Sequence, residues 1–501
     1  MDKLIGYIQI AIFGLALSVP TLMFLFDGPS GPFERRTQTA FPTFSSVIGS
    51  DSEYRDQLSD AIFERSTAKK SAISLKSEIS RDIFRFVDQG DVVSGDTGWL
   101  FHKSAFSNWD CSNHPRLMSQ LERFEIVVEV ADAANADILF VVAPNKASVN
   151  KSAIKGRASM MAACYLEFEN EFRSAMRAIG SERIIDHFQI LNESTDVAPT
   201  YYQTDTHWNS FGDALATEQV LERIPFDPAV DVSVSELPDT LETSGDLNQM
   251  LLSSRREPER SFTVTVTDEA IDAISRFAQG SRIRIVHDSF YARIEPLFQA
   301  IAPDISFERV GLETFKNLEL APSDFIIVQV VERNFLQQAG HPDFFGWGSP
   351  IGDWLLERSA EAAAECDWDS GLNLMEASPQ LSSTANLGRS ELDAWVTENG
   401  DQQLKVAIPS QWGGDQVCFN VVVESDEPSP IQLFLPVKKD AKAAVSYSGG
   451  ASILLYPDDR TVSMKLVLPS RVAGETIRLR PSRRAGAKIT DLTIAAKSTG
   501  D

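Results

Sequence analysis

RIRIVHDSFYARIEPLFQAI, residues 282 to 301, holds the pattern that decides the fold. Its first half is a short run rich in isoleucine and valine, which is typical of a β-strand, and Tyr291 to Ile301 then has the character of a helix. The polar pair Asp288 and Ser289 stands between the two. The stretch therefore predicts a buried strand, a sharp turn and a helix that follows at once.

The same order of elements recurs on both sides of this stretch. DILFVVAP, residues 137 to 144, and DFIIVQVVE, residues 324 to 332, are continuous apolar runs of the kind that fills a parallel sheet buried on both faces. Helical segments are expected around Leu166 to Ile179 and from Asn209 onward, with a short strand at Arg183 to Asp186. This alternation predicts an α/β domain with a parallel sheet and right-handed crossovers.

Polar residues follow each predicted strand, and such sheets place their sites beyond the carboxyl ends of the strands. The residues in question are Asn145 and Lys146, Asp288 and Ser289, then Glu332 and Arg333. Reactive side chains are therefore expected along one edge of the sheet, although ordinary loop polarity would produce the same pattern.

The C-terminal part has a different pattern. VCFNVVVE, IQLFLPV, SILLYP, SMKLVLP and TIRLRP are short strands with turn residues between them, which predicts an antiparallel β-sandwich or jelly roll. We expect an anchor and linker over residues 1–32, a catalytic domain over 33–345, a connector over 346–380 and the sandwich over 381–501. Four aromatic residues of this part either stack on sugar rings, as in carbohydrate-binding modules, or fill the core: Trp412, Phe419, Phe434 and Tyr456.

The N-terminus contains an apolar stretch from Leu4 to Phe26 without Asp, Glu, Lys or Arg. As a helix it would be about 34 Å long, which is enough to cross a bilayer. A cleaved signal peptide is the competing interpretation, but the stretch is longer than a usual signal core and no clear A-x-A site follows. The sequence thus predicts a single-pass membrane protein.

Charge and cysteines narrow the class of protein. Aspartate and glutamate outnumber lysine and arginine by 71 to 46, which disfavours binding to a nucleic-acid backbone. The four cysteines form no CxxC pair, so neither a zinc cage nor a dithiol site is indicated. In an oxidising compartment the expected disulfides are Cys111 with Cys164 and Cys366 with Cys418; four buried thiols are the alternative.

YYQTDTHWNSFG, residues 201 to 212, contains the candidate catalytic base. The chain has only six histidines, and here Asp205 precedes His207 by two residues, so His207 is predicted to act as a general base whose tautomer Asp205 holds. A structural histidine at a helix cap is an alternative. Zinc hydrolysis is a weaker one, because no H-E-x-x-H motif accompanies the pair, and we expect no metal and no cofactor.

Ser289 is the candidate nucleophile, because a serine in a sharp turn after a strand can meet a base while backbone N–H groups face the developing oxyanion. The order Asp, His, Ser along the chain is allowed, since triads are defined by geometry. Candidates for substrate binding or the oxyanion hole are Lys146, Trp208, Asp288 and Arg333. A basic groove for an anionic glycan would draw on Arg282, Arg284 and Arg293.

Several segments, in this order, resemble the SGNH-hydrolase-like proteins related to AlgJ and AlgX, which O-acetylate alginate in the bacterial periplasm. They are GDTGWLF at 95–101, P-N-K at 144–146, Y-x-x-T-D-T-H-W-N at 201–209, GDLNQML at 245–251, HDSF at 287–290 and VVER at 330–333. The resemblance spans roughly residues 33 to 335 and implies a triad of Asp205, His207 and Ser289. His287 departs from the pattern, since many SGNH enzymes have glycine there.

The resemblance implies an O-acetyltransferase that moves an acetyl group through a serine acyl-enzyme onto hydroxyls of an exported, alginate-like polysaccharide. It also implies a membrane-bound O-acyltransferase as the acetyl source and a location in the bacterial inner membrane, with the catalytic domain in the periplasm. Two alternatives stay open: a carbohydrate esterase of the same fold, and a non-catalytic protein that binds or assembles exopolysaccharide.

Overall fold

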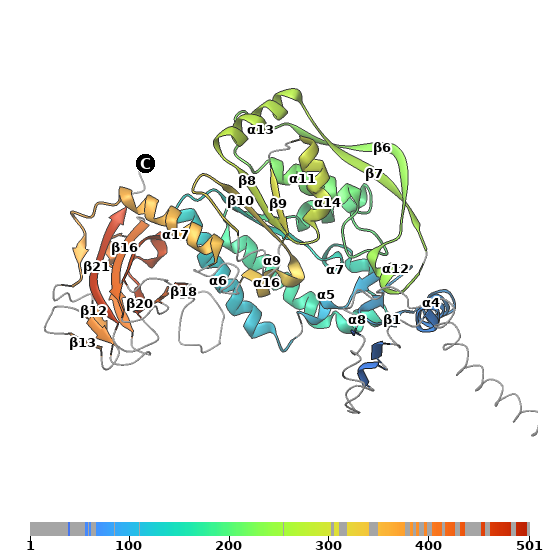
Figure 1. The fold of residues 1–501 in the computed structure, drawn as a ribbon, viewed down its shortest axis with the longest axis horizontal. Helices are drawn as coiled ribbons and strands as arrows, with labels where there is room; N and C mark the ends of the chain where they lie inside the picture. Colours follow the sequence, from blue (N-terminus) through green and yellow to red (C-terminus); the bar gives the residue numbers. More distant parts are fainter. Residues whose placement is uncertain are drawn as a thin grey trace, which may run out of the picture.

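A computed structural model gives the architecture shown in Figure 1. It describes residues 39–40, 56–58, 60–61, 67–84, 86–109, 111–253, 255–301, 305–309, 318–339, 349–375, 381–383, 387–389, 395–397, 403–412, 416–425, 431–435, 452–455, 461–481 and 487–497. Within these ranges, the chain forms an α/β part followed by a β-sandwich, with α17, Pro350–Ala362, lying between the two (Figure 1).

The α/β part is built on a five-stranded sheet in the order β5-β4-β10-β8-β9. All its neighbouring strands run parallel, which confirms the predicted parallel sheet. The strands are β4, Ile138–Ala143; β5, Ile184–Asp186; β8, Ile283–His287; β9, Ser306–Arg309; and β10, Phe325–Val331. The central strands β4 and β10 are buried along their whole length, as their unbroken apolar runs predict.

Helices cover both faces of this sheet. Alternate residues of each strand point to opposite faces, so Phe140 and Val328 join one apolar core while Val141 and Ile327 join another. The first core includes α6, His114–Ala133, and α9, Ala163–Ile179. The second includes α11, Ser210–Leu221; α13, Asp268–Gly280; and α14, Tyr291–Ile301. This layering leaves the loops at the carboxyl ends of the strands to form a site.

Smaller elements surround that edge of the sheet. A three-stranded antiparallel sheet consists of β1, Asp88–Gln89; β2, Val92–Ser94; and β3, Leu100–His102. A long antiparallel ribbon pairs β6, Val232–Thr243, with β7, Glu257–Val266, and the short helix α12, Asp246–Met250, connects them. The remaining helices are α4, Thr67–Asp82; α5, Ser104–Ser107; α7, Lys146–Val149; α8, Arg157–Met161; α10, Phe188–Glu193; and α16, Glu332–Ala339.

The C-terminal part is a sandwich of two antiparallel sheets, as predicted. One sheet contains β13, Leu387–Arg389; β14, Trp395–Thr397; β21, Lys488–Lys497; β16, Gln416–Glu424; and β19, Thr461–Leu468, with β11, Leu372–Asn373, beside β21. The other contains β12, Leu381–Ser383; β15, Leu404–Ala407; β20, Thr476–Arg480; β17, Ile431–Phe434; and β18, Ser452–Leu455. Their facing apolar residues form one core.

The aromatic residues of the sandwich do not form the shared sugar platform that the sequence raised as a possibility. Phe419 is fully buried and lies in the core, and Trp412 packs against that core from a partly buried position. Phe434 is 9 % exposed. Tyr456 lies outside the described residues.

Specific contacts fix the sandwich against the α/β part. The guanidinium of Arg471 forms two hydrogen bonds of 2.6 Å with the carboxylate of Glu129 on α6. The hydroxyl of Ser359 on α17 accepts a 2.9 Å hydrogen bond from the backbone N–H of Val467 on β19. Two disulfides are present, Cys111–Cys164 and Cys366–Cys418, which confirms the expected pairing.

The expected location, in the inner membrane as a single-pass protein with a periplasmic catalytic domain, is contradicted. Among the residues that the structure describes, none of the helices combines the length and the apolar character that a bilayer span requires. α6 has 20 residues and would be long enough, but it carries charged side chains along its length. The stretch that prompted the prediction, residues 4–26, lies outside the described residues.

Candidate active site

Ser289 lies in the turn between β8 and α14, at the carboxyl end of the parallel sheet. Asp288 shapes this turn. One of its carboxylate oxygens accepts a hydrogen bond from the N–H of Phe290 at 2.9 Å, and the other accepts one from Val331 on β10 at 2.6 Å. Both oxygens are therefore engaged with backbone groups. Asp288 positions the turn, and its predicted role in substrate binding or the oxyanion hole is not supported.

His207 connects the serine to an aspartate. Its Nε2 lies 2.9 Å from Ser289 Oγ, and its Nδ1 lies 2.7 Å from Asp205 Oδ1. The same Asp205 oxygen accepts the backbone N–H of His207 at 3.0 Å, which fixes the ring relative to the carboxylate. The three predicted residues thus form a continuous chain of hydrogen bonds.

Asp205 stays ionised in this arrangement. Burial acts to raise the pKa of its carboxyl, but hydrogen bonds from the His207 ring and backbone, together with the charge of the imidazolium, outweigh burial and hold the pKa well below its usual range. An anionic Asp205 accepts a hydrogen bond from Nδ1–H, so Nε2 is left without a proton and is able to take that of Ser289.

Lys146 does not face a substrate. Its ammonium is buried and donates to three backbone carbonyls of the loop that carries the triad, namely those of Tyr202 at 3.2 Å, Gln203 at 3.1 Å and Asp205 at 2.6 Å. Those three hydrogen bonds use all three of its protons. The prediction of an oxyanion or substrate contact is wrong for this residue, which instead holds the loop in place.

Trp208 is likewise part of the core. Its side chain is fully buried, and its ring packs edge-on against Phe290 with a centroid distance of 5.0 Å. Phe290 in turn lies 4.8 Å from the ring of His207. The predicted substrate contact of Trp208 is therefore wrong, because the buried indole supports His207 from inside through Phe290.

Arg333 is the last of the four residues that were predicted to bind substrate or the oxyanion. It places a cationic side chain near the triad. Its guanidinium lies 5.7 Å from the ring centroid of Phe290 and donates to Asn145 Oδ1 at 3.2 Å. Burial lowers the pKa of Arg333, while the carboxylates of Asp288 and Asp246 act in the opposite direction. Its side chain is half-buried, so a bound anion or carbonyl oxygen could meet it.

The three arginines proposed from the sequence for a basic groove each have a neighbouring partner. Arg282 forms hydrogen bonds with Asp324, Arg284 with Glu308, and Arg293 with Tyr202. His287, which departs from the family pattern, is buried at the end of β8, where its Nδ1 lies 2.7 Å from the carbonyl oxygen of Asp288.

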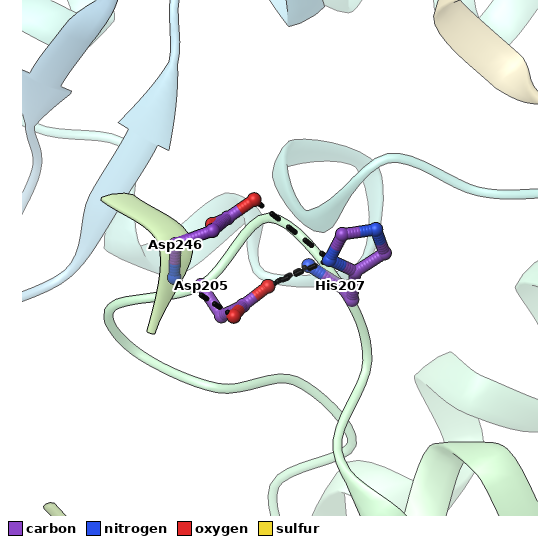
Figure 2. A group of neighbouring side chains, drawn as sticks. All are labelled: Asp205, His207 and Asp246. Atoms are coloured by element: carbon purple, nitrogen blue, oxygen red, sulfur yellow. Dashed lines mark hydrogen bonds and ion pairs between the residues drawn. The ribbon is translucent and has the colours of Figure 1, made fainter. Parts of the chain in front are cut away.

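Two residues that lie at the site were not predicted as site residues from the sequence. Asn145 follows β4, and its Nδ2 is buried without a hydrogen-bond partner. Asp246 begins α12 and lies against both Asp205 and His207 (Figure 2). The signals were present, since Asn145 ends a predicted strand and Asp246 belongs to GDLNQML, but neither pattern specifies contact with the triad.

The serine, the histidine and the aspartate, joined by hydrogen bonds at the carboxyl edge of a parallel α/β sheet, have the arrangement of a serine-hydrolase-type triad. Residues 92–282 match the family described as "SGNH hydrolase-like domain, acetyltransferase AlgX". This segment is therefore similar to the AlgX family, as the sequence resemblance implied. The matched segment includes Asp205, His207 and Asp246 and ends before Ser289.

Solved structures give weaker likenesses. The O-acetyltransferase domain of Pseudomonas putida AlgJ is 18% identical, with 50% of this chain and 99% of that chain covered, at a TM-score of 0.35. Pseudomonas aeruginosa AlgX is 12% identical, with 81% and 93% covered, at a TM-score of 0.36. The xylan-binding module CBM15 is 12% identical, with 26% and 98% covered, at a TM-score of 0.20. These TM-scores are too low to support an argument. No curated protein matches the sequence.

Proposed function

We propose that this protein is an O-acetyltransferase that carries an acetyl group on Ser289 and transfers it to hydroxyls of an alginate-like polysaccharide. The observation that carries the proposal is the continuous hydrogen-bonded chain from Ser289 Oγ through His207 to Asp205. The family match adds the acetyltransferase class.

In the first half of the reaction, His207 Nε2 takes the hydroxyl proton as Ser289 Oγ attacks the acetyl carbonyl carbon. The N–H of Ser289 is proposed as a backbone donor to the resulting oxyanion, and Arg333 supplies positive charge near the triad. The bond to the donor's leaving group then breaks, and His207 returns the proton to that group. In the second half, a sugar hydroxyl gives its proton to His207 and attacks the acyl carbon; the bond from that carbon to Ser289 Oγ then breaks, and His207 returns the proton to Oγ.

The acetyl donor is proposed to be supplied by a separate membrane-bound O-acyltransferase, as for the family that this chain resembles. A transfer enzyme of this kind must favour a sugar hydroxyl over water at the acyl-enzyme. If water reacts as readily, the same residues constitute a carbohydrate esterase, so the acceptor decides between the two activities.

A second candidate role, glycan binding, is favoured by the outer face of the sandwich. The guanidinium groups of Arg478 and Arg480 on β20 lie 4.9 Å and 5.6 Å from the ring centroid of Phe434. Lys405 on β15 stands opposite Arg478 and is exposed. Positive charge gathered around an aromatic ring, in a chain of net charge −25, suits an anionic glycan such as a polyuronate.

The proposal is tested by intact-mass spectrometry of the full-length protein after incubation with 4-nitrophenyl acetate. We expect a single added acetyl group in the wild type and none in Ser289→Ala, with acylation strongly slowed in His207→Ala. Addition of oligoguluronate or oligomannuronate should discharge the adduct faster than water does and yield acetylated sugar.

Three other results would change the conclusion. Discharge at the same rate with and without sugar would favour the esterase. No adduct in any form, together with unchanged sugar binding in Ser289→Ala, would favour the non-catalytic binding protein. An adduct on another residue would remove Ser289 from the mechanism.

A further inference from the structure

Asp246 is the second carboxylate at the triad (Figure 2), and it comes from α12, 41 residues further along the chain than Asp205. Its side chain is 7 % exposed. Its backbone N–H donates a 2.9 Å hydrogen bond to Asp205 Oδ2, the oxygen that does not face His207 Nδ1. Both oxygens of Asp205 are thus held, one by His207 and the other by Asp246.

The carboxylate of Asp246 also reaches towards the histidine. Its Oδ1 accepts the backbone N–H of Thr206 at 2.7 Å, and its Oδ2 accepts the Thr206 hydroxyl at 2.6 Å. The same Oδ2 lies 3.8 Å from His207 Nδ1, and the hydroxyl oxygen of Thr206 lies 3.1 Å from that nitrogen. Asp246 therefore fixes the residue between Asp205 and His207 and places its charge beside the ring.

The fold brings α12 unusually close to the loop of the triad. At Gly245 a Cβ atom would lie 2.1 Å from the carbonyl oxygen of Thr204, so only glycine fits this position. The same carbonyl accepts the N–H of Leu247 at 3.1 Å. The approach that places Asp246 is thus built into the backbone and does not depend on its side chain alone.

We propose that Asp246 is a positioning residue of the triad, a second carboxylate that orients Asp205 and stabilises the His207 imidazolium. This inference rests on the proposed function, in which His207 takes the proton of Ser289. When Ser289 Oγ bonds to the acyl carbon, that proton moves to Nε2 and the ring becomes positive between the two carboxylates. The proton then passes to the oxygen of the leaving group as the acyl–oxygen bond breaks, and the ring is neutral again.

Other charged groups around the ring must be included in any pH argument. Asp205 and Asp246 face His207 from the triad loop and from α12. Arg333 on α16 interacts with the charge of Asp246, Arg293 on α14 interacts with that of Asp205, and the ammonium of Lys146 binds the Asp205 carbonyl. If the charge of Asp246 is removed, these cations are less opposed, and protonation of the ring becomes harder.

The test compares full-length wild type with Asp246→Asn, Asp246→Glu and the control Asp324→Asn, which alters a buried carboxylate at the other end of β10. The rate of Ser289 acetylation by 4-nitrophenyl acetate is measured from acidic to neutral pH, with circular dichroism to confirm folding. In Asp246→Asn we expect a rate about tenfold lower, with the acidic limb of the rate profile moved down by on the order of one pH unit. Asp246→Glu should restore the limb, and Asp324→Asn should leave it in place.

The outcomes separate this inference from the proposed function. Suppose that the wild type forms the adduct and that folded Asp246→Asn has the same acetylation rate and the same acidic limb. The positioning role would then be overturned, and the proposed function would stay intact. No wild-type adduct would overturn both. If Asp246→Asn does not fold, the result for Asp246→Glu is used instead. A slower acetylation rate with the acidic limb at the wild-type pH supports the positioning role, and an unchanged rate contradicts it.

Discussion

Two groups of buried carboxylates lie at the carboxyl end of the same sheet, and they receive different donors. Asp205 and Asp246 are held by backbone N–H groups, by the Thr206 hydroxyl and by His207. Glu332 and Glu169, both fully buried, share the guanidinium of Arg173. One group is arranged around a ring that can gain and lose a proton, and the other around a permanent cation.

The pKa directions follow this difference. Hydrogen bonds and the charge of His207 outweigh burial at Asp205 and hold the pKa of its carboxyl low. At Glu332, burial is the largest effect, and it outweighs the charge of Arg173 and raises the pKa to about 7. Glu332 accepts a hydrogen bond from the backbone N–H of Asn145 at 2.7 Å. The group formed by Arg173, Glu169 and Glu332 therefore holds the loop that follows β4. We infer that the first group serves the chemistry and the second the fold.

The largest expected effect is that of Asp205→Asn on catalysis. Without the anion at Nδ1, His207 loses both its tautomer control and the partner of its imidazolium, and the rate of Ser289 acetylation should fall about 10³- to 10⁴-fold. The measurement is acetylation by 4-nitrophenyl acetate at neutral pH. Asp186→Asn, which alters a partner of Arg173, is the control and should keep most of the rate. A loss of less than tenfold in Asp205→Asn would contradict the division between the groups.

The next effect concerns stability. Arg173→Met leaves the buried Glu332 without its cation and Glu169 with Lys151 alone, which should lower the free energy of unfolding by about 3–5 kcal/mol. Urea denaturation followed by circular dichroism measures this change. Arg255→Met breaks an ion pair with the half-exposed Asp82 and should cost less than about 1 kcal/mol. Equal losses in the two variants would show that the buried group is no more important than a surface pair.

The smallest effect is a pH dependence at Glu332. Between its ordinary pKa of 4.5 and the raised value of about 7, the folded protein keeps a proton that the unfolded chain has released. Stability therefore falls as pH rises through this window, by up to about 3 kcal/mol. Glu332→Gln should remove that fall in urea denaturation curves recorded across the window. If the variant keeps the full dependence on pH, another group causes it.

Much of the fold could be predicted because the parallel strands are short, unbroken apolar runs. Residues 137–144 and 324–332 became β4 and β10, and the polar residues after the strands do lie at one edge. The contacts Ser289–His207–Asp205 follow from that topology and from the D-x-H motif. Both expected disulfides are present: Cys111 and Cys164 lie within the predicted catalytic domain, and Cys366 of the predicted connector bonds Cys418 of the sandwich.

The predictions of substrate or oxyanion contacts failed because they depend on the direction in which a side chain points. The position of a residue at the end of a strand does not determine that direction. Lys146 turns inward to backbone carbonyls, Trp208 packs behind Phe290, and Asp288 binds the N–H of Val331. Asp246 was missed because the ribbon of β6 and β7 carries α12 back to the triad, and no local pattern marks that return. Such contacts are tertiary and depend on close approaches like that at Gly245.

The pairing of Arg471 with Glu129 and the contact between Ser359 and Val467 also have a consequence for hydrodynamics. With α17 packed between them, the sandwich and the α/β part should tumble in solution as one rigid body, with a single rotational correlation time. A polymer held by Arg478 and Arg480 would then be offered to Ser289 at a constant offset along its contour. Under the proposed function, each acetyl group would then be added at a fixed distance along the polymer from the segment that the two arginines hold.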